Sequence, residues 1–597
     1  MTRRPSSDVL RALRWLAILA VGGLLLLLGP SLVASGRGRG AAPAPVYLSR
    51  ALGQGGPAAR AVADMATLGI SGPETMTVAA ASFEGGVRRL ARIRPVAMPM
   101  PPELGVAEST RVGRVALSDP AVQRARAKSG SPPGPNMPNA IQNFAGLDFN
   151  TWGAGYPPDT NGDVGPNDYV QAVNTSIGIF SKTGTGLAAF TFNALWLNAG
   201  SGTPCDTNNN GDPVALYDAQ ADRFIVADFA WTNADAGPHY ECIAASKTGD
   251  PTGDWWLYAV RADDDANPWL NDYPKLGVWP DGIYMSANMF ACSNNCGSAN
   301  YEGARVWAFN RDDLYSGAAL RVVRFDAGGG YFTLLPSNLR APASGVQTLT
   351  APFTVYLPAI FNGQSARPNY FVSNDFVCCS LDVFKFHVDW ANPLASTFSS
   401  PIQVAEDSFS EPGSVPESDG APALDSLGSR LMMQNQYRNI GGSESLWIAH
   451  TADDAPTGIR WYQLDVTGGT VATTPVQQGT YRPDSAYRWM PSLAVDKFGN
   501  MAVGYSVSNS GQHPDIRYAG RLASDPLGTL GQAETTLVTG GGSQTSCFGG
   551  TCTRWGDYSA MTVDPVDDCT FWYTTEYYAG DGGDWQTRIG SFRFAGC

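Results

Sequence analysis

The chain has 597 residues, of which 16% are charged and 11% are aromatic, and its formal net charge is −14. Residues 1–138 hold 17 Lys and Arg against 7 Asp and Glu, whereas residues 139–597 hold 23 against 47. So acidic a body would repel phosphates, which excludes nucleic acid as an expected partner, and the 67 glycines and 42 prolines predict many short strands and turns.

Residues 1–35 have the pattern of a signal peptide or an uncleaved signal anchor. Four arginines precede an apolar run from Trp15 to Ala34, and small residues suited to cleavage stand at 33–35. About 20 apolar residues also suffice to span a bilayer, so both interpretations stay open. The positive charge before the run predicts an extracytoplasmic body, which is secreted or is anchored to the membrane only if this segment is uncleaved.

Residues 36–138 are rich in Ala, Gly, Pro and Arg and show no sustained period of 2 or 3.6. This composition predicts a low-complexity, mostly disordered stalk. From about Asn139 the composition changes to Asn, Asp, Gly, Trp and Tyr, so we expect the folded domain to span residues 139–597.

The folded domain contains a repeated phrase. Residues 488–496 read RWMPSLAVD and residues 554–564 read RWGDYSAMTVD, with Val495 and Val563 68 residues apart. That period suits a four-stranded propeller blade, and weaker copies recur near Asp159, Asp212, Asp272 and Asp419. The predicted fold class is all-β, a single β-propeller of seven four-stranded blades, with six or eight blades, or a row of separate β-sandwiches, as alternatives. The run 140–149 would supply the missing outer strand of the last blade.

Residues just before each innermost strand of a propeller converge beside the central channel. Carboxylates and guanidiniums gathered there would bind a polar ligand: a small molecule, a glycan or another anionic group, or a surface protein. The predicted ligand-binding residues are Asp272, Tyr273, Arg488, Trp489, Arg554, Trp555, Asp557 and Tyr558. Arg488 and Arg554 are the first candidates for an anionic ligand. The alternative is that each Asp caps a turn and each Arg pairs with a neighbouring blade.

Two segments have the alternating oxygen ligands of a calcium loop. The first is Asp159, Asn161 and Asp163, and the second is Asp206, Asn208, Asn210 and Asp212. Neither has the closing Glu of an EF-hand loop, so Asx turns are the alternative. We expect a structural calcium ion and no organic cofactor.

Ten cysteines fit an exported protein with disulfides. The neighbours in sequence are Cys292 with Cys296, Cys547 with Cys552, and the vicinal pair Cys378–Cys379, while Cys205 with Cys242 and Cys569 with Cys597 would complete an even set. A zinc site is disfavoured because the four histidines are scattered and no two CxxC pairs occur. A monomer is expected.

Signals for catalysis are weak, since the chain has no G-x-S-x-G, H-E-x-x-H or phosphate-binding glycine loop. The weak catalytic candidates are Glu576, Tyr577 and Asp557. A Tyr and Glu near arginines is the arrangement that a sialidase uses, and an aromatic packing layer is the alternative.

Residues 492–501 (SLAVDKFGNM) resemble a degenerate Asp-box of sialidase-type propellers, although Asp496 and Gly499 stand one residue further apart and no Trp follows. Residues 157–166 and 554–576 more closely resemble a group of uncharacterised exported bacterial propeller proteins. That resemblance covers residues 140–597 and implies secretion and the fold, without an activity. The function expected is therefore ligand binding at the channel face, with a sialidase-like glycoside hydrolase as the alternative.

Overall fold

The computed structural model describes residues 69–90, 119–123, 135–340, 360–361, 364–365, 367–374, 379–428, 430–547 and 552–597. All of them belong to one compact unit, residues 62–597. The predicted signal peptide or anchor at residues 1–35 lies outside the described residues. Within the described ranges, no helix is both long enough and apolar enough to cross a membrane.

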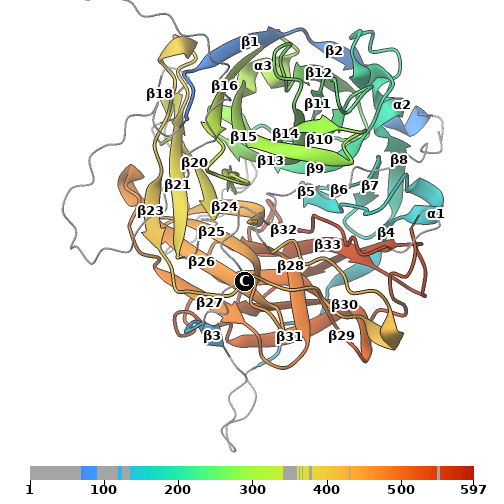
Figure 1. Ribbon diagram of the computed structural model, residues 1–597, viewed down its shortest axis with the longest axis vertical. Helices are drawn as coiled ribbons and strands as arrows, with labels where there is room; N and C mark the ends of the chain where they lie inside the picture. The colour runs from blue at the N-terminus through green and yellow to red at the C-terminus, as the bar shows by residue number, and fades with distance from the viewer. Residues whose placement is uncertain are drawn as a thin grey trace, which may run out of the picture. The chain divides into compact units, whose positions relative to one another are not determined.

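The described part is all-β, and its strands form groups, antiparallel within themselves, that follow the chain order (Figure 1). Parallel pairing of their first strands joins the fourth and fifth groups in one sheet. The first two groups are β5 (Asn161–Val164), β6 (Asp168–Val173), β7 (Ser176–Ser181) and β8 (Gly186–Thr191), then β9 (Gly211–Asp218), β10 (Arg223–Ala230), β11 (Tyr240–Ser246) and β12 (Trp255–Arg261). The third is β13 (Leu270–Trp279), β14 (Gly282–Ser293), β15 (Ser298–Asn310) and β16 (Leu320–Gly328).

The fourth group is less regular than the others. It contains β17 (Leu335–Leu339), β20 (Asn369–Asn374) and β21 (Ser380–His387), and both β22 (Thr397–Phe398) and β23 (Ile402–Ala405) pair with β21. A separate hairpin joins β18 (Ile360–Phe361) and β19 (Gln364–Ser365).

The remaining groups are regular. The fifth is β24 (Met432–Ile440), β25 (Ser443–Ala452), β26 (Gly458–Asp465) and β27 (Gln477–Tyr481). The sixth is β28 (Tyr487–Val495), β29 (Met501–Asn509), β30 (Gln512–Arg521) and β31 (Gln532–Val538), and the last is β32 (Ala560–Val563), β33 (Phe571–Tyr577), β34 (Gln586–Phe592) and β4 (Gln142–Asp148).

The first strands of successive groups contact one another in order: β5 with β9, β9 with β13, β13 with β17, β17 with β24, β24 with β28, and β28 with β32. The series returns to its start, because β32 also contacts β5. Buried apolar clusters lie between neighbouring groups, so both faces of most strands are covered. Burying these faces is the main favourable term that holds the groups together.

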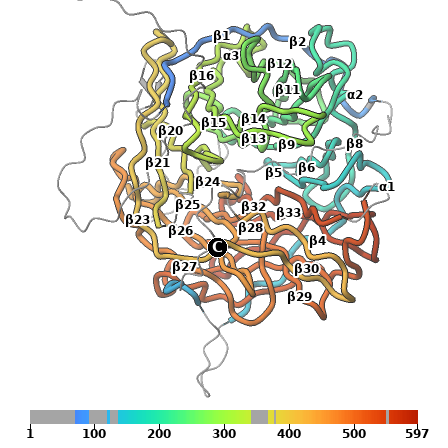
Figure 2. Tube along the Cα trace, viewed as in Figure 1, coloured from blue at the N-terminus to red at the C-terminus, as the bar shows by residue number. Residues whose placement is uncertain are grey.

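Strand β4 completes the last group, as the sequence predicts. It pairs antiparallel with β34, with Ile589 opposite Phe144 and Ser591 opposite Gln142. In Figure 2 the label of β4 stands beside that of β33, among the C-terminal strands. A segment before the first group is thereby joined to the end of the chain, and the outer edge of β34 is not left unpaired.

Parts of the predicted stalk are folded, which corrects the expectation of disorder for those residues. Strand β1 (Glu74–Val78) pairs with β16, β2 (Ala81–Phe83) pairs with β12, and the short β3 (Val122–Gln123) pairs with β27 (Figure 1). These strands use backbone hydrogen bonds to the outer strands of existing sheets, which needs little apolar sequence of their own. Hydrophobic periodicity therefore does not reveal them.

Helices are short and lie in the connections. They are α1 (Phe149–Trp152), α2 (Phe192–Trp196) and α3 (Arg311–Ser316), with 3₁₀ turns η2 (Val87–Arg89), η4 (Pro204–Asp206), η5 (Pro393–Ala395), η6 (Ser418–Gly420) and η7 (Thr467–Gly469).

The repeat was placed wrongly in the fifth group. The sequence pattern places Asp419 just before an innermost strand, but Asp419 is exposed in the long connection between β23 and β24, whose residues 406–428 we call the β23–β24 loop. The innermost strand is β24, which begins at Met432. Val415 and Leu424 of the loop pack in the same apolar cluster as Trp489 and Trp555, so its apolar residues imitate the pattern of a strand.

Among the described residues, four disulfides link cysteine pairs that the sequence suggests. They are Cys205–Cys242, Cys292–Cys296, Cys547–Cys552 and Cys569–Cys597. Disulfides persist in oxidising compartments, so they are consistent with an extracellular protein.

Candidate functional site

Four aspartates lie together where the first strands of the first, second, third and last groups begin. The N–H of Asp557 donates to Asp159 Oδ1 at 2.8 Å. The Tyr558 hydroxyl donates to Asp212 Oδ2 at 2.7 Å. Asp272 lies close enough to Asp212 for the Asp212 carboxylate to raise the pKa of Asp272. We call Asp159, Asp212, Asp272, Lys275, Arg554, Asp557 and Tyr558 the channel-face cluster.

Backbone geometry explains why Asp recurs at these positions. Asp159, Asp212 and Tyr273 have φ values of 45°, 51° and 57° at the starts of three first strands. Asp and Asn tolerate this left-handed conformation better than most residues because their side chains bond to nearby backbone. In Tyr273 the same backbone shape brings its N–H to Asp212 Oδ2 at 3.2 Å. At Asp159 and Asp212 the repeat therefore marks both a turn and a residue of the channel-face cluster.

Basic side chains balance part of this negative charge. Lys275, which sequence reasoning missed, is buried with its Nζ 3.2 Å from the ring centre of Tyr273 and 3.5 Å from that of Tyr558. Arg554 donates from Nη2 to Asp557 Oδ1 at 2.8 Å, and 21% of its side chain is exposed. The sequence signal for Lys275 is a charged residue within the mostly buried strand β13.

Burial shifts the protonation equilibria of the cluster. It raises the pKa of Asp212 to about 6 and that of Asp272 to about 8, with neighbouring carboxylates adding to both shifts. Burial and the carboxylates of Asp557 and Asp212 also raise the pKa of Asp159, and burial lowers the pKa of Lys275. Because a charged carboxylate loses hydration when it is buried, Asp212 and Asp272 titrate near neutral pH.

Glu576 lies at the edge of this cluster. It is buried on β33, accepts a hydrogen bond from the Gly556 N–H, and has its pKa raised to about 8 by burial. Tyr577 follows it on the strand, and successive strand residues point to opposite faces. Tyr577 packs against the apolar cluster between the sixth and last groups. The weak candidates Glu576 and Tyr577 therefore do not form the Tyr–Glu pair of a sialidase-type site.

The prediction that Arg488 would meet an anionic ligand does not hold. Its buried guanidinium makes bonds of 2.8–3.0 Å to Asp484 and 3.0 Å to Glu534, so its donors are committed within the sixth group. Trp489 and Trp555 are also buried, with ring centres 5.6 Å apart in an edge-to-face contact. These two rings are core residues rather than ligand contacts.

In the first predicted calcium loop the side chains diverge. Asp163 receives Arg340 on both oxygens, Asn161 Oδ1 accepts from the Ala215 N–H, and Asp159 belongs to the channel-face cluster.

In the second predicted loop, the carboxylate of Asp206 accepts from Ser201 and Gly202, Asn208 donates to the Trp231 carbonyl, and Asn210 accepts from the Trp231 N–H. Neither loop brings its oxygens together, and in the described ranges no three His, Cys, Asp or Glu side chains are grouped to hold an ion. Calcium at these loops stays a prediction from the sequence.

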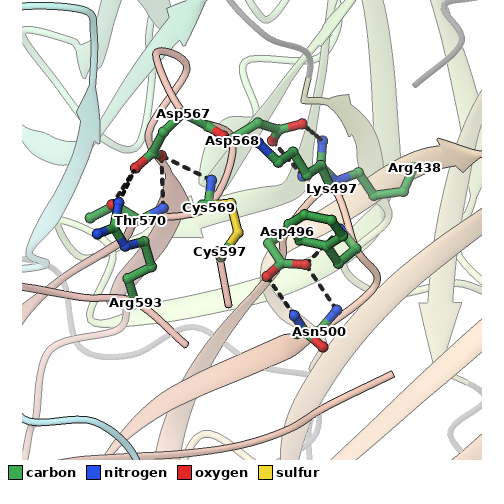
Figure 3. Close-up of a disulfide and its surroundings, with 11 residues drawn as sticks. Arg438, Asp496, Lys497, Asn500, Asp567, Asp568, Cys569, Thr570, Arg593 and Cys597 are labelled. Carbon is green, nitrogen blue, oxygen red and sulfur yellow. Dashed lines mark hydrogen bonds and ion pairs between the residues drawn. A yellow bond between two sulfur atoms is a disulfide. The ribbon is translucent and has the colours of Figure 1, made fainter. Parts of the chain in front are cut away.

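The Asp-box-like segment closes a turn. Asp496 accepts from the N–H groups of Phe498 and Asn500 and from Asn500 Nδ2, at 2.8–3.0 Å (Figure 3). Beside it, Arg438 reaches Asp568 with bonds of 2.6 and 3.2 Å, in the turn stapled by Cys569–Cys597 (Figure 3). These aspartates stabilise turns and join groups, so they are structural residues.

No family model and no curated protein matches the sequence. Among solved structures, a protein of unknown function from Dyadobacter fermentans has a TM-score of 0.33 at 11% identity, covering 64% of this chain and 94% of that one. A Hadza microbial sialidase has a TM-score of 0.32 at 10% identity, covering 73% and 75%. An ulvan lyase of polysaccharide lyase family PL25 has a TM-score of 0.27 at 11% identity, covering 61% and 76%. Likenesses this distant carry no conclusion about activity.

Proposed function

We propose that this protein is an exported, seven-bladed β-propeller that binds a neutral, hydroxyl-rich ligand, a glycan, at the channel-face cluster. The first strands of seven strand groups contact in a continuous series, which supports the blade number, and parallel pairing of β17 with β24 joins the fourth and fifth groups in one sheet. Four disulfides support export.

The observation that carries the binding proposal is the mixed set of donors and acceptors in the cluster. Asp272 and Arg554 are partly exposed, while Asp159, Asp212 and Asp557 are buried. Sugar hydroxyls donate to carboxylates and accept from guanidinium groups, so such a set suits a polyol. Carboxyls outnumber the basic groups, which favours a neutral ligand over the anionic one expected from the sequence.

A glycan array probed with the full-length protein tests this proposal. We expect one glycan class to bind, and R554A to weaken binding at least about tenfold because it removes the exposed donor. The matched control is R593A, whose guanidinium is also partly exposed but lies elsewhere, beside Asp567. An array without any binder, or equal binding by wild type and R554A, would contradict the proposal.

A glycoside hydrolase is the second candidate, and one observation favours it. The partly exposed Asp272 has a pKa of about 8, so at neutral pH it holds a proton that a glycosidic oxygen would accept. We expect such an enzyme to hydrolyse a member of a fluorogenic glycoside panel and D272N to lose the activity. If no glycoside of the panel is hydrolysed, the hydrolase candidate is rejected and only the binding function remains.

A further inference from the structure

Three buried side chains outside the channel-face cluster present oxygens that lack a hydrogen-bond partner. Glu417 lies on the β23–β24 loop, Gln544 on the connection between β31 and β32, and Glu576 on β33. All three are at most 2% exposed. Within the described part of the chain, Glu417 Oε1, Gln544 Oε1 and Glu576 Oε2 have no partner.

The other polar atoms of these side chains are fixed, and they connect the three residues. The Gln544 N–H donates to Glu417 Oε2 at 3.0 Å, and Gln544 Nε2 donates to the Tyr578 hydroxyl at 2.7 Å. The Gly556 N–H holds Glu576 Oε1. Tyr578 lies close enough to Glu417 and Glu576 for both carboxylates to raise its pKa. In each of the three side chains, one polar atom is therefore engaged in a hydrogen bond and one oxygen remains to bind a ligand.

The charges around these oxygens are negative. Glu417 and Asp557 act on Glu576, and Asp581 acts on Glu417, each in the direction that disfavours a second negative charge. Burying unpaired carboxylates costs several kcal/mol per ion unless a positive charge or a proton compensates.

We propose that Glu417, Gln544 and Glu576 form a binding site for a hard divalent cation, with Ca²⁺ as the expected ion. Two carboxylates and an amide carbonyl are oxygen ligands of the kind that Ca²⁺ takes from side chains, and water completes its coordination. The amide orientation fits, because Nε2 of Gln544 is engaged by Tyr578 and leaves Oε1 for the ion. The ion would join the β23–β24 loop to the last group, beside the channel-face cluster but independent of any glycan.

Terbium(III) luminescence of the full-length, EDTA-treated protein tests this site. Trp555 lies 5.5 Å from the ring of Tyr578, so an ion here would receive energy from a nearby indole. We expect saturable emission that excess Ca²⁺ removes. E417Q and E576Q should each weaken binding at least about tenfold, because each replaces an anionic ligand by an amide.

D419N is the matched control, since Asp419 lies on the same loop but is exposed, and it should bind as wild type does. D206N tests the loop predicted from sequence. Absence of saturable emission, emission lost in D206N alone, or equal binding by E417Q and D419N would overturn the proposal. A thermal-unfolding midpoint of the wild type that Ca²⁺ does not raise over EDTA would overturn it without any variant.

Discussion

The guanidinium of Arg340 lies against both carboxylate oxygens of Asp163, with each nitrogen 2.8 Å from its oxygen. Arg340 follows β17 of the fourth group and Asp163 lies on β5 of the first, and the same guanidinium reaches the carbonyls of Tyr217 and Val563. One side chain thus bonds to the first, second and last groups.

Breaking this buried pair should destabilise the fold strongly. We expect R340M and D163N each to lower the free energy of unfolding by about 3–5 kcal/mol, because each leaves a buried group without its partner. Urea unfolding measures this. The control is D265N at the exposed pair with Arg261, which should change stability by less than about 1 kcal/mol. Equal losses of stability at the two pairs would contradict the expectation that the buried Arg340–Asp163 pair stabilises the fold more than the exposed Arg261–Asp265 pair.

Raised carboxyl pKa values predict that stability falls as the pH rises. Glu576 has a pKa of about 8 in the folded protein, above its ordinary value of 4.5. Between those values the folded state keeps a proton that the unfolded chain has released, so the free energy of unfolding decreases with pH in that window. In EDTA, we expect E576Q to lose part of this decrease between pH 5 and 8, on the order of 3 kcal/mol.

D419N should keep the wild-type pH profile, because Asp419 is exposed. Urea unfolding at pH 5, 6.5 and 8 gives the comparison. Parallel profiles for wild type and E576Q would mean that Glu576 does not hold its proton.

The two arginines of the repeated phrase should behave differently. R488A removes a buried guanidinium from Asp484 and Glu534 and should cost about 3–5 kcal/mol of stability. R554A removes a partly exposed side chain and should change stability by no more than about 1 kcal/mol. Thermal unfolding of both variants, run beside the glycan assay, separates the roles; a strongly destabilised R554A would refute this assignment.

The disulfides should contribute according to the length of chain they close. Cys205–Cys242 spans 37 residues and Cys292–Cys296 spans 4. Loop-closure entropy then predicts about 4 kcal/mol for the first and about 2 kcal/mol for the second. We expect C205A/C242A to unfold at a lower urea concentration than C292A/C296A. The reverse order would point to a folded-state role for the short bridge.

The sequence predicted the repeated unit well where strands and turns are short. The phrase around Trp489 and Trp555 marks first strands in the structure, and the strand at 142–148 closes the last group as expected. Prediction was wrong in the fifth group because the β23–β24 loop buries Val415 and Leu424 without forming an inner strand.

The candidate site was predictable only in part, because sequence equivalence does not fix side-chain partners. Arg488 and Arg554 occupy the same place in the phrase, yet one meets Glu534, 46 residues away, and the other meets Asp557. Lys275 follows Asp272 and Glu417 precedes Asp419 in weak copies of the phrase, whose pattern includes neither residue, and only their burial beside carboxyls identifies them.

The pairing of β1 with β16 has a mechanical consequence. Five residues of β1 run antiparallel along β16, on the outer edge of the third group, and β2 follows on the outer edge of the second. Tension applied to the chain before Glu74 would therefore load two peripheral strands, in shear, before it reached any first strand. A protein held by its N-terminal segment would bear that load at its rim and leave the geometry of the channel-face cluster undisturbed.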